Sequence, residues 1–152
     1  MSESIPVLVS ACLLGRACRY DGASRPSDAV EDWLIARGAV AVAVCPEELG
    51  QLGTPRPAAE LRGGDGEAVL SGSARVCRVE DGTDVSEAFV RGARAALQRG
   101  EGAHLAVLKA RSPSCGCGRS WIDGQVRDGD GVFAALLRRR GVQLLTEEDL
   151  DG

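Results

Sequence analysis

Three short, continuous apolar runs constrain the fold of this chain more than any other feature. They occupy residues 5–10 (IPVLVS), 39–44 (AVAVAV) and 104–108 (HLAVL). Uninterrupted apolar runs of this length are typical of strands that are buried on both faces of a sheet. Helical patterns accompany them at 26–37, 83–99 and 132–140, and a further short strand is predicted at 142–145. This pattern predicts a single layered α/β domain with a mainly parallel sheet flanked by helices and right-handed crossovers.

Long loops follow the three predicted strands, at residues 11–24, 47–62 and 109–130. Loops beyond about 12–15 residues in a compact domain are usually functional. Ligands of open parallel sheets bind outside the carboxyl ends of the strands, so we expect the functional site there. Residues 68–80 alternate enough to predict a pair of strands around Ser71 and Gly72, and the acidic residues 146–152 predict a frayed tail.

Length and composition limit the classes of protein that this chain can belong to. Its 152 residues suit one domain, which we expect to span 1–152. The net charge of −4 argues against a broad nucleic-acid-binding face, so free nucleic acid is not an expected partner. No apolar run approaches the roughly 18–20 residues of a membrane span. Because residues 1–4 also lack the features of a signal peptide, we expect a cytoplasmic protein.

Cysteine placement points to metal or thiol chemistry. The chain has six cysteines and one histidine, and disulfides are rare in the expected compartment. Cys12, Cys45 and Cys115 lie in matching loops after the three strands, although 33 and 70 residues separate them. Parallel strand ends at one sheet edge would bring them together. Three thiolates favour a soft metal, and three protein ligands leave one position open for substrate.

The scarcity of histidine favours iron–sulfur over zinc, because catalytic zinc sites usually include histidine. His104 begins a buried strand and is predicted to be structural. The other cysteines have several interpretations. Cys18 is a fourth ligand, a reactive thiol or a pocket residue; Cys117 competes with Cys115 for the third position; Cys77 is predicted to be a small core residue.

Short separated motifs surround these cysteines. In chain order they are VSACLLG at 9–15, CRYDG at 18–22, CPE at 45–47, TPRP at 54–57, AE at 59–60, LK at 108–109 and SPSCG at 112–116. Together they resemble the bacterial thiouracil desulfidase (TudS) family, and the resemblance covers residues 7–145. Because several separated motifs agree in order, the resemblance is specific.

The resemblance implies a 4Fe-4S cluster held by Cys12, Cys45 and Cys115, with one iron open for the substrate's sulfur. It implies hydrolytic, non-redox removal of sulfur from a thiolated pyrimidine such as 2-thiouracil, giving uracil and hydrogen sulfide. The family's catalytic acidic residue falls on Glu47. Its catalytic serine falls on Ser112 or Ser114, of which Ser112 is favoured.

Further residues of these motifs are second-rank candidates for substrate binding, namely Asp21, Arg56 and Lys109. For Asp21, a turn formed with Gly22 is the favoured interpretation. The segments 50–52 and 116–124 depart from the family pattern, so Trp121 and Cys117 are expected to alter the pocket and the choice of substrate. Two alternatives stay open: a non-catalytic metal or iron–sulfur module for binding or sensing, and a thio-transfer enzyme acting on modified nucleotides.

Overall fold

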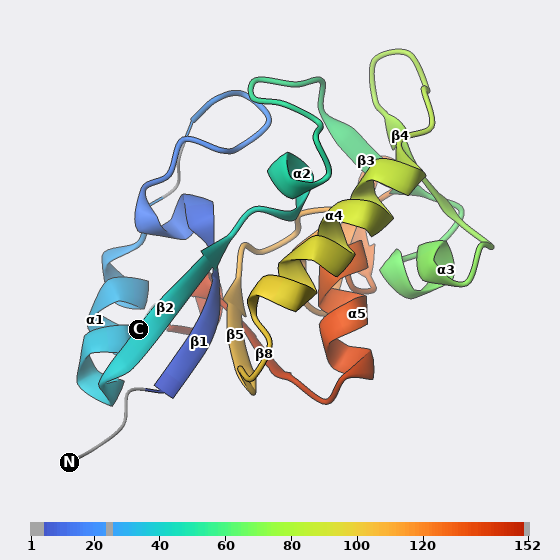
Figure 1. Ribbon diagram of the computed structural model, residues 1–152. Helices are drawn as coiled ribbons and strands as arrows, with labels where there is room; N and C mark the ends of the chain where they lie inside the picture. The colour runs from blue at the N-terminus through green and yellow to red at the C-terminus, as the bar shows by residue number, and fades with distance from the viewer. Residues whose placement is uncertain (1–4, 24–25, 151–152) are drawn as a thin grey trace.

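The computed structural model describes residues 5–23 and 26–150 and shows an α/β protein (Figure 1). Within this part of the chain, eight strands form two four-stranded sheets. The strands are β1 (Ile5–Ser10), β2 (Ala39–Val44), β3 (Ala59–Arg62), β4 (Arg75–Arg78), β5 (Leu105–Leu108), β6 (Arg119–Ile122), β7 (Gln125–Asp128) and β8 (Gln143–Thr146). The helices are η1 (Ala11–Leu14, a 3₁₀ helix), α1 (Asp28–Arg37), α2 (Pro46–Leu49), α3 (Gly66–Leu70), α4 (Ser86–Arg99), α5 (Val132–Arg139) and α6 (Glu147–Leu150).

Sheet A has the strand order β2-β1-β5-β8, and all its strands are parallel. Successive side chains of β1 point to opposite faces: Leu8 packs in the core with α4 and α5, whereas Val7 and Val9 pack with α1. The sheet therefore stands between α1 on one face and α4 and α5 on the other, as Figure 1 shows. This confirms the predicted mainly parallel sheet flanked by helices.

Helix α2 packs closely on α4, and glycines make the contact possible. A Cβ added to Gly92 of α4 would overlap the carbonyl oxygen of Pro46, and one added to Gly50 would overlap the carbonyl oxygen of Ala88. Arg91 also donates a hydrogen bond to the Gly50 carbonyl oxygen at 2.7 Å. The backbone contact fixes α2, and with it the residues that directly follow β2.

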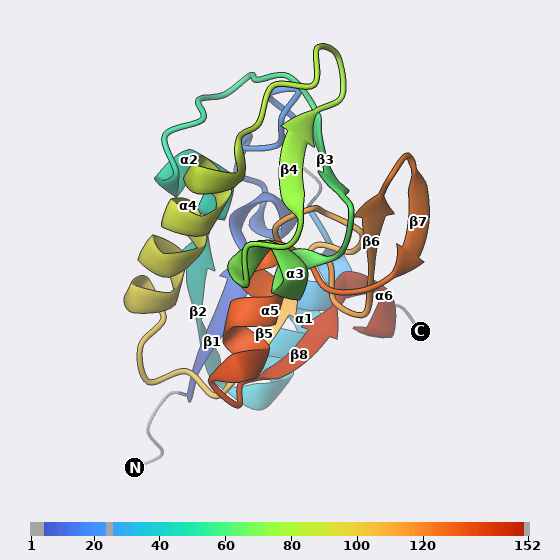
Figure 2. The ribbon, with the colours of Figure 1, turned by 90° about the vertical axis from the view of Figure 1, so that its right-hand side faces the viewer.

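Sheet B has the order β4-β3-β6-β7 and was not predicted. Figures 1 and 2 show β3 and β4 beyond the carboxyl ends of sheet A. The predicted strand pair at 68–80 is wrong: Asp65 caps helix α3 by accepting from the Ala68 N–H at 3.0 Å, so only β4 is extended. Residues 119–128, expected as loop, form the β6-β7 hairpin, and both of its turn residues, Asp123 and Gly124, have positive φ.

The expected frayed tail is also wrong for the residues that the structure describes. Thr146 ends β8, and residues 147–150 form α6. Asp149 accepts from the Thr146 N–H at 2.8 Å, and Glu147 accepts from the Ala110 N–H at 2.7 Å. Glu147 is thus tied to the loop after β5 and Asp149 to the end of β8, contacts that the sequence pattern does not reveal. None of the helices in the described segments has both the length and the apolar character needed to cross a membrane.

Candidate metal centre and its pocket

A cavity of about 1080 Å³ opens at the carboxyl ends of β1, β2 and β5. All three predicted cysteine ligands line it, and so does Cys18. The cavity thus lies where the parallel sheet predicts a ligand site. Its remaining walls include Arg19, Tyr20, Arg56, Lys109, Arg111, Ser112, Ser114, Trp121 and Glu147.

Each cysteine is positioned by the element that follows its strand. Cys12 lies in η1, directly after β1, and Cys45 directly precedes α2, where Pro46 is a favourable first residue. Cys115 lies in a tight turn in which Ser112 Oγ accepts from the backbone N–H groups of Ser114 and Cys115, both at 3.1 Å. These local bonds orient side chains that come from three distant parts of the sequence.

Burial and neighbouring thiols disfavour the ionisation of Cys18, Cys45 and Cys115 in the protein without a bound cation. Burial raises the pKa of the Cys115 thiol to about 12. The neighbouring Cys12 raises the pKa of Cys18 to about 11, and contact with Cys18, together with burial, raises the pKa of Cys45. Metal binding requires thiolates, and a cation supplies the compensating charge that these groups lack. A group of buried soft donors therefore fits a soft metal or an iron–sulfur group.

Glu47 lies on α2, two residues after Cys45, and both of its carboxylate oxygens have partners. Arg56 Nε donates to Oε1 at 3.1 Å, and Ser114 Oγ donates to Oε2 at 2.9 Å. The side chains of Arg56 and Glu47 are 5% and 16% exposed. Arg56 also donates to the Cys18 carbonyl oxygen at 3.0 Å. The Arg56 guanidinium therefore links the Glu47 carboxylate to the loop that carries Cys18.

The two candidate serines have different surroundings. Ser114 is buried, contacts Glu47, and also lies with its Oγ 3.9 Å from Cys115 Sγ. Ser112 Oγ lies 3.2 Å from Ser114 Oγ and accepts the two backbone N–H groups of its own turn. Of the two hydroxyls, Ser114 is the one that contacts the carboxylate, although sequence reasoning favours Ser112.

The second-rank candidates separate into two groups. Arg56 and Lys109 line the cavity, and the Lys109 ammonium pairs with Glu147 at 3.0 Å. Asp21 does not line it: its carboxylate accepts from the Ala23 N–H at 3.0 Å and closes a local turn. Glu147 is a cavity residue that sequence reasoning placed in a tail, because no local signal marks it.

The other cysteines and the histidine lie away from the cavity. Cys77 is buried in β4, in agreement with its predicted role as a core residue. Cys117 lies beside Arg138, which donates to its sulfur at 3.5 Å, and it does not line the cavity. His104 is exposed just before β5, at the opposite end of that strand from the site. Trp121 of β6, by contrast, does line the cavity.

Comparisons with known proteins show the family of this chain. A family profile described as 2-thiouracil desulfurase matches residues 7–149. A solved structure titled [4Fe-4S]-dependent thiouracil desulfidase TudS is similar with a TM-score of 0.78 and 43% identity, covering 97% of this chain and 93% of that one. A Bacillus subtilis (strain 168) protein named uncharacterized protein YbbK is 39% identical over 150 residues, which is 95% of this chain and 97% of that protein. The chain therefore belongs to the 2-thiouracil desulfurase family.

Proposed function

We propose that this protein is an iron–sulfur-dependent desulfidase that replaces the sulfur of a thiolated pyrimidine, such as 2-thiouracil, with oxygen from water. The observation that carries the proposal is one cavity in which buried cysteines adjoin a carboxylate held by an arginine and a serine. The similar solved structure is titled as [4Fe-4S]-dependent, which supports the same type of cofactor here.

Cys12, Cys45 and Cys115 are the proposed ligands of a 4Fe-4S cluster. They come from three neighbouring strand ends, and the raised pKa values of Cys45 and Cys115 mean that these two thiols require a cation before they ionise readily. Three protein ligands leave one iron without a cysteine, as catalytic metal sites leave one position for substrate. When bound, such a cluster supplies a soft Lewis acid to which a thiocarbonyl sulfur can bind.

Glu47 is the proposed acid and base. The reaction adds water across a carbon–sulfur double bond and expels hydrogen sulfide, so one group must take a proton from water and return one to the leaving sulfur. Arg56 fixes Oε1, which leaves Oε2 for proton exchange through the Ser114 hydroxyl. Ser112 holds the turn that places Ser114 between Glu47 and Cys115. No electrons are gained or lost overall, because sulfur leaves at the oxidation level at which it arrived.

Lys109 is the proposed contact for a carbonyl oxygen of the pyrimidine. Its ammonium lies at the cavity wall, and pairing with Glu147 keeps it there rather than in solvent. Glu147 in turn accepts from the Ala110 backbone N–H, so the pair is anchored to the loop that carries Ser114. A lysine held in this way donates to a neutral carbonyl without adding a free positive charge to the cavity.

The size and charge of the cavity favour a second candidate substrate, a thiolated pyrimidine that carries a sugar phosphate. A volume of about 1080 Å³ is at the upper end of typical small-molecule sites. Arg19 and Arg111 line the cavity in addition to Arg56 and Lys109, and arginine is well suited to bind phosphate. This candidate uses the same desulfuration at the same site.

The proposal is tested with protein that is purified and reconstituted with iron and sulfide without oxygen, then incubated with 2-thiouracil. We expect uracil and sulfide in equal amounts, with no added reductant. Glu47→Gln should retain its iron and lose the activity, and Glu67→Gln, an exposed carboxylate paired with Arg139, should behave as wild type. A Glu47→Gln variant that releases sulfide at the wild-type rate would falsify the assigned role. A cluster without any desulfidase activity would indicate a binding or sensing module.

A further inference from the structure

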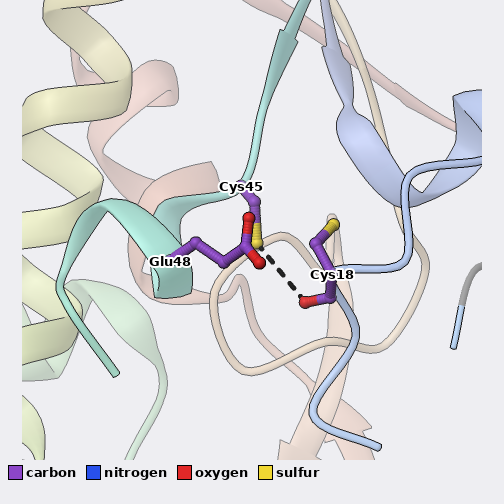
Figure 3. A group of neighbouring side chains, drawn as sticks. All are labelled: Cys18, Cys45 and Glu48. Atoms are coloured by element: carbon purple, nitrogen blue, oxygen red, sulfur yellow. Dashed lines mark hydrogen bonds between the residues drawn. The ribbon is translucent and has the colours of Figure 1, made fainter. Parts of the chain in front are cut away.

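A second group of ligand atoms lies at the edge of the same cavity. Cys18 Sγ, Cys45 Sγ and a carboxylate oxygen of Glu48 all lie within 4.8 Å of one another. Figure 3 shows the three side chains together with the hydrogen bond from Cys45 to the Cys18 carbonyl oxygen. Cys18 comes from the loop after η1, and Glu48 comes from α2, one residue after the proposed catalytic Glu47. Of the three, only Cys45 belongs to the proposed cluster ligands.

The spacing of this group suits one ion rather than a cluster. Cysteines on different irons of a cluster must span its core, whereas ligands of a single ion converge on one point. Two thiolates of one tetrahedral zinc ion, each bound at about 2.3 Å, lie roughly 3.8 Å apart. The ligand atoms here lie within 4.8 Å of one another, so rotations of the Cys18 and Cys45 side chains would bring both thiolates onto one ion.

Neighbouring residues orient the three ligands. Cys18 is 2% exposed, and its carbonyl oxygen accepts from Arg56 and from the Cys45 thiol, the latter at 3.6 Å. Glu48 accepts from Arg16 Nε at 3.1 Å and from Thr54 Oγ1 at 2.6 Å. Each carboxylate oxygen has two lone pairs, so these bonds leave acceptor capacity for a metal. Ligating carboxylates in metal sites are commonly held by such outer hydrogen bonds.

We propose that Cys18, Cys45 and Glu48 bind one soft divalent ion, Zn²⁺ or Fe²⁺, when the iron–sulfur cluster is absent. Two thiolates and one carboxylate with water in the fourth position form a tetrahedral site that suits these ions. Binding releases the two thiol protons to solvent. Because Cys45 belongs to both ligand sets, the single ion and the cluster exclude each other. The ion would hold the loop after η1 against α2 in the cluster-free protein.

The test uses reduced, cluster-free protein titrated with Co²⁺ without oxygen and without sulfide. Cobalt reports tetrahedral geometry by its visible ligand-field bands, and bound thiolates by a near-ultraviolet charge-transfer band. We expect one equivalent to bind with both signatures, and Zn²⁺ to displace it. Cys18→Ser should weaken binding by about tenfold or more and reduce the charge-transfer band. Glu48→Gln should weaken binding by a similar factor and leave that band unchanged, while Glu67→Gln should have no effect.

Cys115→Ser separates this proposal from the cluster. It should bind Co²⁺ as wild type does but fail to hold iron and sulfide on reconstitution, whereas Cys18→Ser should hold iron and sulfide and bind Co²⁺ weakly. The proposal is overturned if wild type binds no Co²⁺, or if Cys18→Ser and wild type share affinity and spectrum. It is also overturned if Cys115→Ser loses the cobalt signal. Each of these results is independent of whether the loaded protein desulfurates thiouracil.

Discussion

Sheet A and sheet B meet at the same cavity but contribute different parts of it. Sheet A delivers the cysteines, because Cys45 directly follows β2 and Cys12 lies two residues after the end of β1. Sheet B contributes wall residues such as Ala59 of β3 and Trp121 of β6 and none of the cysteines that line the cavity. The proposed chemistry therefore resides at the edge of the parallel sheet, whereas sheet B shapes the space around the substrate.

The largest expected effect separates the cysteines of the two sheets. Cys115→Ser should abolish stable cluster binding, because one of three proposed anchors is lost from the edge of sheet A. Cys77→Ser, in the middle of β4, should keep its iron and sulfide. Iron and sulfide analysis after identical reconstitution measures both. Equal iron contents in the two variants would contradict the proposal that Cys115, and not Cys77, holds the cluster.

The next largest effect is expected at Glu47. Glu47→Gln preserves size and polarity but removes the base, so kcat should fall by about 10²–10⁴-fold. Arg56 and Ser114 contact this carboxylate, and none of the three side chains belongs to sheet B. The absorption spectrum of the loaded variant should match that of wild type. An unchanged kcat would show that the carboxylate only supports the structure.

A change in packing should reach the site through α2. Gly92→Ala forces a methyl group into the Pro46 carbonyl oxygen, and overpacking of this kind costs about 1–3 kcal/mol. The shift moves Cys45 and Glu47 together, so iron retention should fall along with stability. Gly102→Ala is a useful comparison, because nothing lies within 4 Å of its added Cβ, although its φ of +93° adds strain. Urea unfolding with iron analysis distinguishes lost stability alone from a displaced site.

The buried thiols give the cluster-free protein a pH-dependent stability. Burial raises the pKa of Cys115 from 9.0 to about 12, so the folded state holds this proton more tightly than the unfolded state. The contribution of the protonated Cys115 thiol to the free energy of unfolding is therefore complete below about pH 9 and is lost as the pH rises toward 12. Unfolding free energies measured anaerobically at rising pH should fall less steeply in Cys115→Ser. If the unfolding free energies of wild type and Cys115→Ser fell equally steeply with pH, a raised pKa of Cys115 would be contradicted.

The smallest expected effect is in sheet B. Trp121 is 46% exposed and lines the cavity, so it offers a surface on which a pyrimidine can stack. Trp121→Ala should raise KM by about three- to tenfold and leave kcat nearly unchanged, because one aromatic contact is worth about 0.5–1.5 kcal/mol. A large fall in kcat instead would show that sheet B takes part in the chemistry.

The same contrast explains which parts of the fold the sequence predicts. Strands β1, β2 and β5 are continuous apolar runs, so a parallel sheet follows from residue type alone. The predicted burial is wrong for β2, which lies at the edge of sheet A and buries only Val44. The strands of sheet B are four residues long and carry charged residues such as Glu60 and Arg127. Their pairing is set by long-range contacts and by the turn at Asp123 and Gly124, which a local pattern does not specify.

The site was predictable to a similar degree. The cysteines and Glu47 stand in compact motifs after strands, and the structure brings them to one cavity. Glu147 and the contact between Ser114 and Glu47 depend on tertiary packing across more than thirty residues, so the sequence offers no local signal for them. Asp21 stands in a family-like motif but lies outside the cavity, because its carboxylate forms a local turn with the Ala23 N–H.

The proposed cluster with three cysteine ligands is best tested by the Mössbauer spectrum of ⁵⁷Fe-loaded protein before and after anaerobic addition of 2-thiouracil. If Cys12, Cys45 and Cys115 are the three ligands, one iron should differ from the other three, and its signal alone should shift when the substrate is added. Four equivalent irons that do not respond to thiouracil would contradict the account, because they would indicate a fourth cysteine ligand and no open position for sulfur.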